Sequence, residues 1–458
     1  MNVILLCSRR PIVAEFLLLA ETLEENDLQP VLVVPPGLIQ SLPVLPSSWR
    51  IISTDVAVWR KAGLGAFLHY AGLTLLRRLS TISSRARNSL IPDFLSTWEA
   101  VMRGKLFAGQ VLKLSRTTCA AILTADDRDI RFDQGVIAFG RKNRIPVLTV
   151  AFGKSDPDAD FFRRNNATHQ IDSSPFRSLK NRIAKRYPAG IRTSAQTGPL
   201  LFFRPGEYLA LSLHDSLFPT PWSYGGGTGD KVAVIDRQAA DMLSALGVSE
   251  EKISVAGQCS HDVLWAFRAE RNAIRENLNA RHGFAATDKL MVVALPVFGE
   301  HGMSDKSVHV AETEWLLATL ASVRNSAVLV SLHPRQKRSD YESLARSLHV
   351  SIADEPLRNV LAAADLFVAN SSTISWAQLL KIPTIALEYY DLGYELFGNE
   401  PGVLTVRSRD DLRATCEAAL YDADTMLTLN TALDALGDNI PFDGKARQRI
   451  VAEIAQHR

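Results

Sequence analysis

The hydrophobic pattern of the first half alternates between short apolar runs and helical spacing. Residues 3–7 and 30–34 are apolar runs typical of buried strands, and residues 11–23 between them place apolar side chains every three or four positions. The same alternation predicts strands at 120–124, 145–150, 231–235 and 253–255, a helix at 134–142 and another that ends at Leu246. Strands that alternate with helices of about ten residues indicate βαβ units and a parallel sheet.

The second half repeats this alternation. Apolar runs predict strands at 289–294, 327–332, 350–352, 366–369 and 384–387, with helices around 312–324, 340–348, 359–364 and 373–380. Two such series in one chain predict an α/β protein with two Rossmann-like domains that face a cleft. We place the first domain at residues 1–257 and the second at 258–440, because the small and polar stretch 256–260 closes the first series.

Two segments interrupt the alternation and are rich in basic side chains. Residues 58–90 combine a helical apolar spacing with several arginines, and residues 175–192 carry six basic side chains and no acidic one. A basic amphipathic stretch of this kind can lie on an anionic membrane surface. The simpler interpretation is a solvated helix face over a hydrophobic core, and the sequence leaves both interpretations open.

The composition excludes several classes of protein. With 47% hydrophobic and 22% charged residues among 458, the chain falls in the range of folded globular proteins. Its 51 basic and 49 acidic residues give a net charge of +2, too small an excess for general nucleic-acid binding, so we expect no nucleic-acid partner. No stretch reaches the roughly 18–20 apolar residues that span a bilayer. Arg9 and Arg10 interrupt the N-terminal apolar run where a signal peptide needs continuity.

The four cysteines lie far apart and form no CxxC pair. Their spacing argues against a structural zinc site or a disulfide framework and fits a reducing compartment. We therefore predict a cytoplasmic protein. Nothing else in the sequence requires a metal ion, and we predict none.

A glycine-flanked turn follows the predicted strand at 289–294. It contains Gly299, Glu300 and His301, and the backbone N–H groups of such a turn can approach a phosphate closely at the carboxyl end of a strand. Many strand-to-helix turns use glycine for geometry alone. We nevertheless include these three residues in a predicted nucleotide-binding site.

The strand at 327–332 ends in His333, Pro334 and Arg335. Pro334 biases His333 to an extended backbone, so that the imidazole points off the edge of the sheet. The imidazole and the Arg335 guanidinium together suit a phosphate or diphosphate. A lone histidine is more often structural, so this motif gains weight only beside the other strand ends.

The strand at 366–369 is followed by Ser371, Ser372 and Thr373, after which a helix begins. Several hydroxyls at a helix N-terminus suit an anion, although plain N-capping explains the same residues. Because parallel strands end at one edge of a sheet, the three turns predict a single nucleotide site in the second domain.

Two longer segments carry a family resemblance. Residues 246–257 and 442–450, together with the strand-end motifs, resemble GT-B glycosyltransferases, in the branch of bacterial surface-polysaccharide transferases and UDP-N-acetylglucosamine 2-epimerases. The resemblance implies that a C-terminal helix at 441–458 returns to the N-terminal domain. It also implies a nucleotide-sugar co-substrate and no separate cofactor.

The resemblance distinguishes two enzyme types. The epimerases carry paired glutamates a few residues into the helix after the serine turn, where Ser375 and Trp376 stand here. The His333–Pro334 pair, taken with Ser371 and Ser372, is similar to the HP and serine motifs of bacterial sialyltransferases and related transferases of acidic sugars, which use CMP-activated donors. The absent acidic pair also leaves uridine recognition open.

Acidic residues follow the strand at 120–124, where Asp126 and Asp127 come directly after Ala125. Transferases of this type need a base to deprotonate the acceptor hydroxyl. The resemblance places it in an acidic pair followed by glycine, and Arg128 replaces that glycine here. We predict Asp127 or Asp126 as the base, with Asp127 first. The alternative is a solvated acidic turn paired with Arg128 and Arg131.

Two further segments are secondary candidates. Asp156, Asp158 and Asp160 alternate after the strand at 145–150, but they lack the glycine and the distal glutamate of a calcium-binding loop. The triple glycine at 225–227 either lets a substrate approach the backbone or forms a flexible loop. If the first two carboxylates are not the base, Asp129, Asp156 and Glu300 are next.

Together these features predict a GT-B glycosyltransferase of bacterial surface glycoconjugate synthesis. It would move a sugar, such as an acidic sugar of the sialic-acid or Kdo type, from a CMP- or UDP-linked donor to a glycan, lipid-linked or protein acceptor. The alternatives are a nucleotide-sugar 2-epimerase and a non-catalytic glycan-assembly protein. If the basic segments dock on anionic lipid, the protein is peripheral at the inner face of the cytoplasmic membrane.

Overall fold

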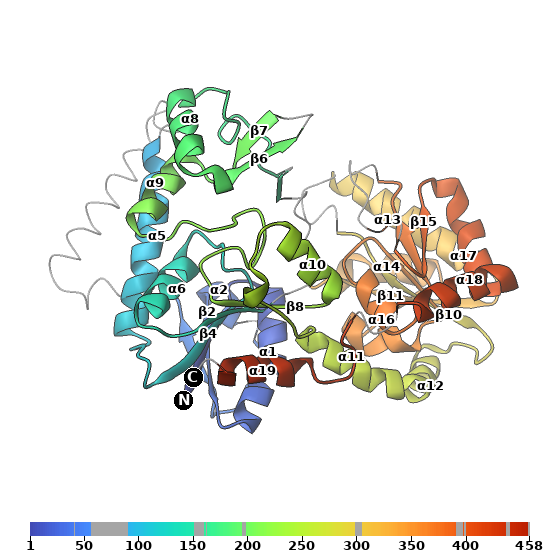
Figure 1. Cartoon of the computed structure of the whole chain (residues 1–458). Coiled ribbons are helices and arrows are strands. Elements are labelled where there is room, and N and C mark those ends of the chain that lie inside the picture. The colour runs from blue at the N-terminus through green and yellow to red at the C-terminus, as the bar shows by residue number, and fades with distance from the viewer. Residues whose placement is uncertain are drawn as a thin grey trace. The chain divides into compact units, whose positions relative to one another are not determined.

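The fold is taken from a computed structural model of the chain. The structure describes residues 1–40, 42–55, 90–150, 160–161, 163–194, 198–297, 305–390, 397, 400–436 and 440–456. The chain divides into two compact units (Figure 1). Unit 1 is Met1–Cys259 with Ala446–Arg458, and unit 2 is Ser260–Lys445.

Unit 1 is built on a parallel sheet with the strand order β3-β2-β1-β4-β5-β8-β9. Its strands are β1 (Asn2–Leu6), β2 (Gln29–Val34), β3 (Arg50–Ser53), β4 (Cys119–Thr124), β5 (Val147–Val150), β8 (Lys231–Val234) and β9 (Ile253–Val255). All residues of β4 are buried, because helices cover both faces of the sheet.

The helices of unit 1 come from widely separated parts of the sequence. They are α1 (Arg10–Glu25), α2 (Pro36–Ile39), α5 (Leu90–Gln110), α6 (Phe132–Lys142), α8 (Arg177–Arg186), α9 (Pro205–Leu213), α10 (Arg237–Ala245) and α19 (Ala446–Gln456). Helices α1 and α19 pack on one face of the sheet, and α5 and α6 on the other. Pro11 lies in the first turn of α1, and the predicted apolar spacing buries Phe16 and Leu19.

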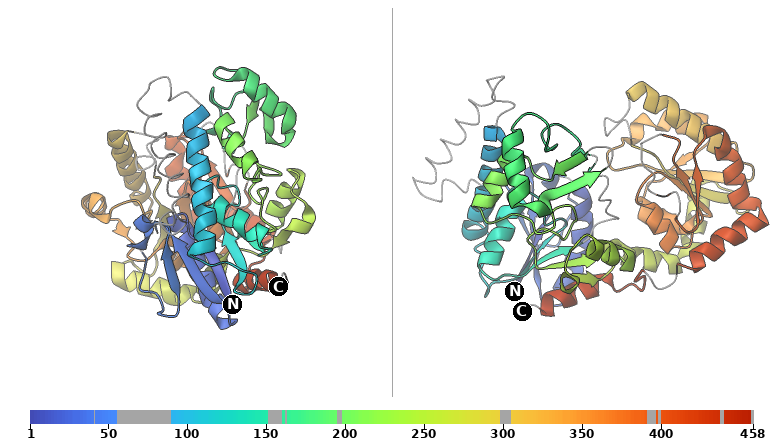
Figure 2. Two further views of the ribbon diagram at one scale, coloured as in Figure 1. Left: turned by 90° about the vertical axis from the view of Figure 1, so that its left-hand side faces the viewer. Right: turned by 45° about the horizontal axis from the view of Figure 1, so that its top comes forward.

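A smaller layer of unit 1 lies beside α5. The antiparallel strands β6 (Ile191–Ser194) and β7 (Gly198–Leu201) join α8 and α9 around an aromatic cluster (Figure 2). The rings of Phe202 and Phe203 meet edge to face at 5.1 Å, and Phe202 meets Trp222 in the same way at 5.2 Å. The sequence patterns did not predict this layer.

Unit 2 has a second parallel sheet, in the order β12-β11-β10-β13-β14-β15. Its strands are β10 (Lys289–Ala294), β11 (Ser326–Ser331), β12 (Ser351–Ile352), β13 (Leu366–Ala369), β14 (Thr384–Leu387) and β15 (Val403–Val406). Its helices are α11 (Cys259–Ala269), α12 (Arg271–His282), α13 (Lys306–Ala321), α14 (Glu342–Ser347), α15 (Leu357–Val360), α16 (Ile374–Leu379), α17 (Leu412–Tyr421) and α18 (Ala423–Asp434). Alternate residues of β10 enter two separate cores, with Met291 and Val293 in one and Leu290 and Val292 in the other.

The predicted α/β class with two Rossmann-like domains is confirmed. In both sheets the strand order reverses next to the first strand, between β1 and β4 in unit 1 and between β10 and β13 in unit 2. Open α/β sheets bind ligands at the carboxyl ends of the strands beside such a switch point. Each unit therefore has one edge where a ligand is expected.

The basic segments have different outcomes. Residues 58–90 lie outside the described residues, apart from Leu90 at the start of α5. Residues 175–192 form α8, a short 3₁₀ turn and β6. In the described part of the chain, no helix is both long enough and apolar enough to cross a membrane.

Candidate functional site

The carboxyl edge of the unit 2 sheet carries the predicted phosphate-binding turns. His333 follows β11 and Ser371 follows β13, and both strands flank β10 at the switch point. Two strand spacings of about 4.8 Å separate β11 from β13. The turns therefore border the loop after β10. That loop contains Gly299, Glu300 and His301, which lie outside the described residues.

The first turn is closed by hydrogen bonds within its own four residues. The Gln336 N–H donates to the His333 carbonyl at 2.8 Å, and Pro334 stands at the second position, where its fixed φ favours a turn. The Arg335 N–H donates to the His333 Nδ1 at 3.1 Å. Because Nδ1 accepts this bond, the neutral ring carries its proton on Nε2. Pro334 and Arg335 are exposed.

The second turn contains Ser371, Ser372 and Thr373. The hydroxyls of Ser371 and Thr373 hydrogen-bond to each other at 2.6 Å, and the Ser375 hydroxyl donates to the Ser372 carbonyl at 2.7 Å. Thr373, the residue before the six-residue helix α16, makes no capping hydrogen bond with its side chain. Plain N-capping by Thr373 is therefore wrong, and a role of these hydroxyls in binding a nucleotide stays a prediction.

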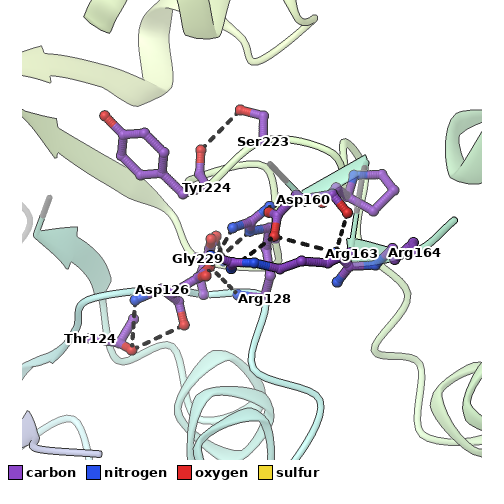
Figure 3. A network of polar contacts seen from close by, with 12 residues as sticks. Thr124, Asp126, Arg128, Asp160, Arg163, Arg164, Ser223, Tyr224 and Gly229 are labelled. Atoms are coloured by element: carbon purple, nitrogen blue, oxygen red, sulfur yellow. Dashed lines mark hydrogen bonds and ion pairs between the residues drawn. The ribbon is translucent and has the colours of Figure 1, made fainter. Parts of the chain in front are cut away.

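Unit 1 carries the predicted carboxylates at its own switch point, directly after β4. Figure 3 shows Asp126 beside Arg128. Asp126 is held by Arg128: Oδ1 accepts the Arg128 N–H at 3.0 Å and Nε–H at 2.9 Å, and Oδ2 accepts Nη2–H at 2.9 Å. The Asp126 side chain is 38% exposed. Within the described chain, these contacts leave one lone-pair site on Oδ2 for a further donor.

Arg128 is itself fixed by the smaller layer of unit 1. Its side chain is only 9% exposed, and Nη1 donates to Asp160 at 3.0 Å and to the Pro221 carbonyl at 3.1 Å. Arg164 also pairs with Asp160 and stacks on the Phe202 ring at 3.9 Å from its centroid. Asp160 is therefore an ion-pair partner. The other two secondary candidates, Asp156 and Asp158, lie outside the described residues.

Asp127 differs from its neighbour because it has no exposed surface. Its Oδ2 accepts the Gly229 N–H at 3.1 Å and lies 3.4 Å from Lys252 Nζ, which also donates to the Gly227 carbonyl at 3.2 Å. Burial raises the pKa of Asp127, and Lys252 opposes that shift. In this arrangement an acceptor hydroxyl cannot reach Asp127, so the geometry ranks Asp126 ahead of it as a base.

The triple glycine at 225–227 packs on this buried carboxyl. A Cβ at Gly227 would lie 2.6 Å from the carbonyl carbon of Asp127 and 2.7 Å from its Cγ. Residues 225–229 are buried. Gly227 therefore allows this loop to approach the loop that carries Asp127.

A second carboxylate pair lies in the same region. Asp129 accepts the Arg131 N–H at 2.7 Å, as in a local turn. Burial and then the charge of Asp129 raise the pKa of the buried Asp133 to about 8, while Arg9 and a hydrogen bond from Ser8 oppose the shift. Ser8 and Arg9 follow β1, Asp129 lies in the loop after β4, and Asp133 lies in the first turn of α6, so the unit 1 edge collects acidic side chains. In the described part of the chain, no three His, Cys, Asp or Glu side chains are placed to hold a metal ion.

Solved structures are similar to the chain over its whole length. The wall teichoic acid polymerase TagF, soaked with CDPG, is 10% identical, covers 100% of this chain and 88% of its own, and has a TM-score of 0.52. A putative UDP-N-acetylglucosamine 2-epimerase from Listeria monocytogenes is 12% identical, with 100% and 96% coverage and a TM-score of 0.51. The UDP-GlcNAc 2-epimerase from Neisseria meningitidis, bound to UDP-GlcNAc, is 10% identical, with full coverage of both chains and a TM-score of 0.53. No protein-family model and no curated protein matches the sequence.

The chain has the GT-B fold.

Within this GT-B chain, the sequence interpretation missed two residues that organise the predicted sites. Lys252 pairs with Asp127 across more than a hundred positions of sequence, and Gln336 closes the His333 turn. A lysine before a strand and a glutamine after a turn carry no distinctive signal. The one signal for Gln336 is its position: it is the third residue after His333, which is the residue that closes a four-residue turn.

Proposed function

We propose that this GT-B chain is a glycosyltransferase that binds a pyrimidine nucleotide-sugar at the carboxyl edge of the unit 2 sheet. The observation that supports it is the His333 turn, in which Nδ1 accepts the Arg335 N–H, so that the neutral ring carries its proton on Nε2. A fixed donor at a strand end beside a switch point suits an oxygen of the leaving phosphate. The exposed Arg335 guanidinium adds positive charge beside it.

The proposed donor is CMP- or UDP-linked, and a CDP-linked donor is tested beside them. Two of the similar structures support this choice, since TagF was soaked with CDPG and the Neisseria enzyme is bound to UDP-GlcNAc. An acidic sugar of the sialic-acid or Kdo type stays our first choice for the CMP-linked case. The reaction needs no separate cofactor in this proposal.

We assign the acceptor base to Asp126 rather than Asp127. Asp126 is partly exposed, and Arg128 holds both of its oxygens in a fixed orientation while one lone-pair site remains among the described contacts. A base must lie within hydrogen-bond reach of the proton it removes. The acceptor is a glycan, a lipid-linked sugar or a protein of bacterial surface glycoconjugate synthesis.

The second candidate is a nucleotide-sugar 2-epimerase, which the epimerase neighbours suggest. Ser375 and Trp376 stand where the resemblance to epimerases implies glutamates, and the Ser375 hydroxyl is engaged by the Ser372 carbonyl. No carboxylate stands at these two positions, which favours transfer. Incubation with donor alone separates the two activities: an epimer of the donor sugar indicates the epimerase.

A thermal-shift panel with CMP, CDP, UDP and GDP tests the donor site. A nucleotide at about 100 times its Kd stabilises the folded protein by roughly 2.7 kcal/mol, so at least one pyrimidine nucleotide should raise the melting temperature. His333→Ala should largely remove this rise. His349→Asn, at an exposed histidine that precedes β12 at the other edge of the sheet, is the matched control and should keep it. If no nucleotide at millimolar concentration has an effect, the proposed site is wrong.

We also propose that helix α8 docks the protein at the inner face of the cytoplasmic membrane. Of the six basic side chains at 175–192, the four exposed ones are Arg177, Arg182, Lys185 and Arg186. Lys180 is fully buried and donates to the Ala167 carbonyl at 2.8 Å, and Arg192 stacks on Phe161. Phe176, 37% exposed, adds an apolar side chain at the start of the helix. Such a surface attracts anionic lipid.

Vesicle co-sedimentation tests this surface. Vesicles rich in phosphatidylserine should bind the protein at low salt and release it at high salt, because screening weakens the charge contacts. Replacing Arg182, Lys185 and Arg186 by glutamine should abolish binding. The same change at Arg116, Arg141 and Lys142, exposed cations elsewhere in unit 1, should leave it intact. Equal loss in both triple variants would show that net charge, not α8, binds the vesicles.

A further inference from the structure

The buried side chain of Gln336 uses both ends of its amide. Its Oε1 accepts the backbone N–H of His333 at 2.8 Å, and its Nε2 donates to the Pro296 carbonyl at 3.2 Å and to the Tyr341 hydroxyl at 3.1 Å. Only 9% of Gln336 is exposed. The His333 N–H is a donor and the Pro296 carbonyl an acceptor, so only one orientation of the amide satisfies both.

These bonds connect three segments of unit 2. Pro296 lies in the loop after β10, His333 in the turn after β11, and Tyr341 at the start of α14. The Tyr341 hydroxyl also lies 3.3 Å from His309 Nε2 in α13. The backbone of Gln336 donates back to the His333 carbonyl. Gln336 therefore binds both the N–H and the carbonyl of His333 and holds Pro296 against the same turn.

We propose that Gln336 is the positioning residue of the donor site, which fixes the turn that carries the His333 imidazole at the nucleotide phosphate. The bond from the Arg335 N–H to Nδ1 requires the tight turn, and Gln336 closes that turn through its side chain as well as its backbone. Without the side chain, the His333 N–H and the Pro296 carbonyl both lose this partner, so the turn is held less firmly against Pro296. This inference rests on the proposed nucleotide site and adds a residue to it.

Gln336→Met tests the inference, since methionine keeps the length of the side chain and removes both polar ends. We expect the Kd for the pyrimidine nucleotide that binds best among CMP, CDP and UDP to rise about tenfold, as measured by calorimetric titration. Gln378→Met is the matched control. Gln378 is also buried in unit 2 and donates to the carbonyl of a proline, Pro401, at 3.0 Å. It lies near the C-terminal end of α16, whereas the Ser371 turn precedes the N-terminal end of that helix. The Kd of Gln378→Met for the same nucleotide should stay within twofold of the parent value.

A double-mutant cycle separates positioning from general stability. In the His333→Ala background, Gln336→Met should change the Kd by less than twofold, because no imidazole is left to position. An equal tenfold loss in both backgrounds would overturn the inference. If Gln336→Met does not fold, Gln336→Glu replaces it in the same cycle. Glutamate keeps an oxygen for the His333 N–H but cannot donate to the Pro296 carbonyl.

Nitrogen NMR of the His333 ring gives an independent result. The parent should show the tautomer protonated on Nε2 at neutral pH, and Gln336→Met should show a mixture of tautomers. An unchanged tautomer together with an unchanged Kd would overturn the inference. If the parent binds none of the three nucleotides, the proposed function fails first. If the parent binds and His333→Ala weakens binding but Gln336→Met does not, only the role of Gln336 is wrong.

Discussion

Replacing Asp127 by asparagine separates a structural carboxylate from a catalytic one. Asparagine keeps an oxygen for the Gly229 N–H, but it leaves the Lys252 ammonium, only 16% exposed, without its counter-charge. Removing one partner of a buried ion pair costs about 3–5 kcal/mol. Lys252 retains the Gly227 carbonyl and some contact with water. We therefore expect the free energy of unfolding to fall by about 2–3 kcal/mol.

Urea unfolding followed by circular dichroism measures this loss. Asp126→Asn is the comparison, because Arg128 keeps Asp160 as its counter-charge, so this change should cost less stability than Asp127→Asn. Adding Lys252→Met to Asp127→Asn removes the unpaired charge and should restore part of the lost stability. In a transfer assay, Asp126→Asn should lose about 10²–10⁴-fold in rate while nucleotide binding persists.

The opposite pattern would refute this reasoning. If Asp127→Asn is as stable as the parent but loses transfer, while Asp126→Asn remains active, then an acceptor does reach Asp127. The buried arrangement would then not be the one that reacts. If both variants keep full activity, the base lies elsewhere, and Asp129 is the next carboxylate of this region.

Three further outcomes follow from the packing of unit 1. Gly227→Ala places a Cβ against the backbone of Asp127 and should destabilise the protein by about 1–3 kcal/mol or more. Gly37→Ala is the control, because its Cβ meets open space. Equal melting temperatures for the two variants would contradict the close approach of Gly227 to Asp127. The pKa of Asp133 is raised to about 8 from an ordinary 3.8, so the folded state holds this proton more tightly than the unfolded chain does. The free energy of unfolding should therefore fall as the pH rises from 4 to 8, by up to about 1.4 kcal/mol per pH unit. Asp133→Asn should flatten that part of the stability curve, and an unchanged slope would assign it to another group. Lys180→Met should lower stability without changing vesicle binding, because Lys180 is buried; a loss of vesicle binding in a folded variant would place it at the membrane.

The central strands could be predicted almost residue for residue. The apolar runs at 289–294, 366–369 and 384–387 coincide with β10, β13 and β14. Strands covered on both faces must be apolar throughout, so the signal is strong. The edge strands β3 and β15 were missed. They lie partly exposed at the ends of the sheets, and such short strands give no distinct apolar run.

The residues at the strand ends could be predicted, but their partners could not. Asp126 and Asp127 are neighbours in sequence with the same chemistry, yet one is partly exposed and the other fully buried. The difference arises from the loop at 225–229 and from Lys252, both about a hundred residues away. Lys180 shows the same limit, since it lies in a basic stretch but is buried against backbone carbonyls.

The account depends most directly on a nucleotide bound through His333 at the carboxyl edge of unit 2. Calorimetric titration of CMP, CDP and UDP into the parent, His333→Ala and His349→Asn measures this binding. We predict one site per chain for at least one of the three nucleotides, a Kd at least tenfold weaker in His333→Ala, and an unchanged Kd in His349→Asn. Binding that is equally strong in all three proteins, or absent from the parent, would contradict the account.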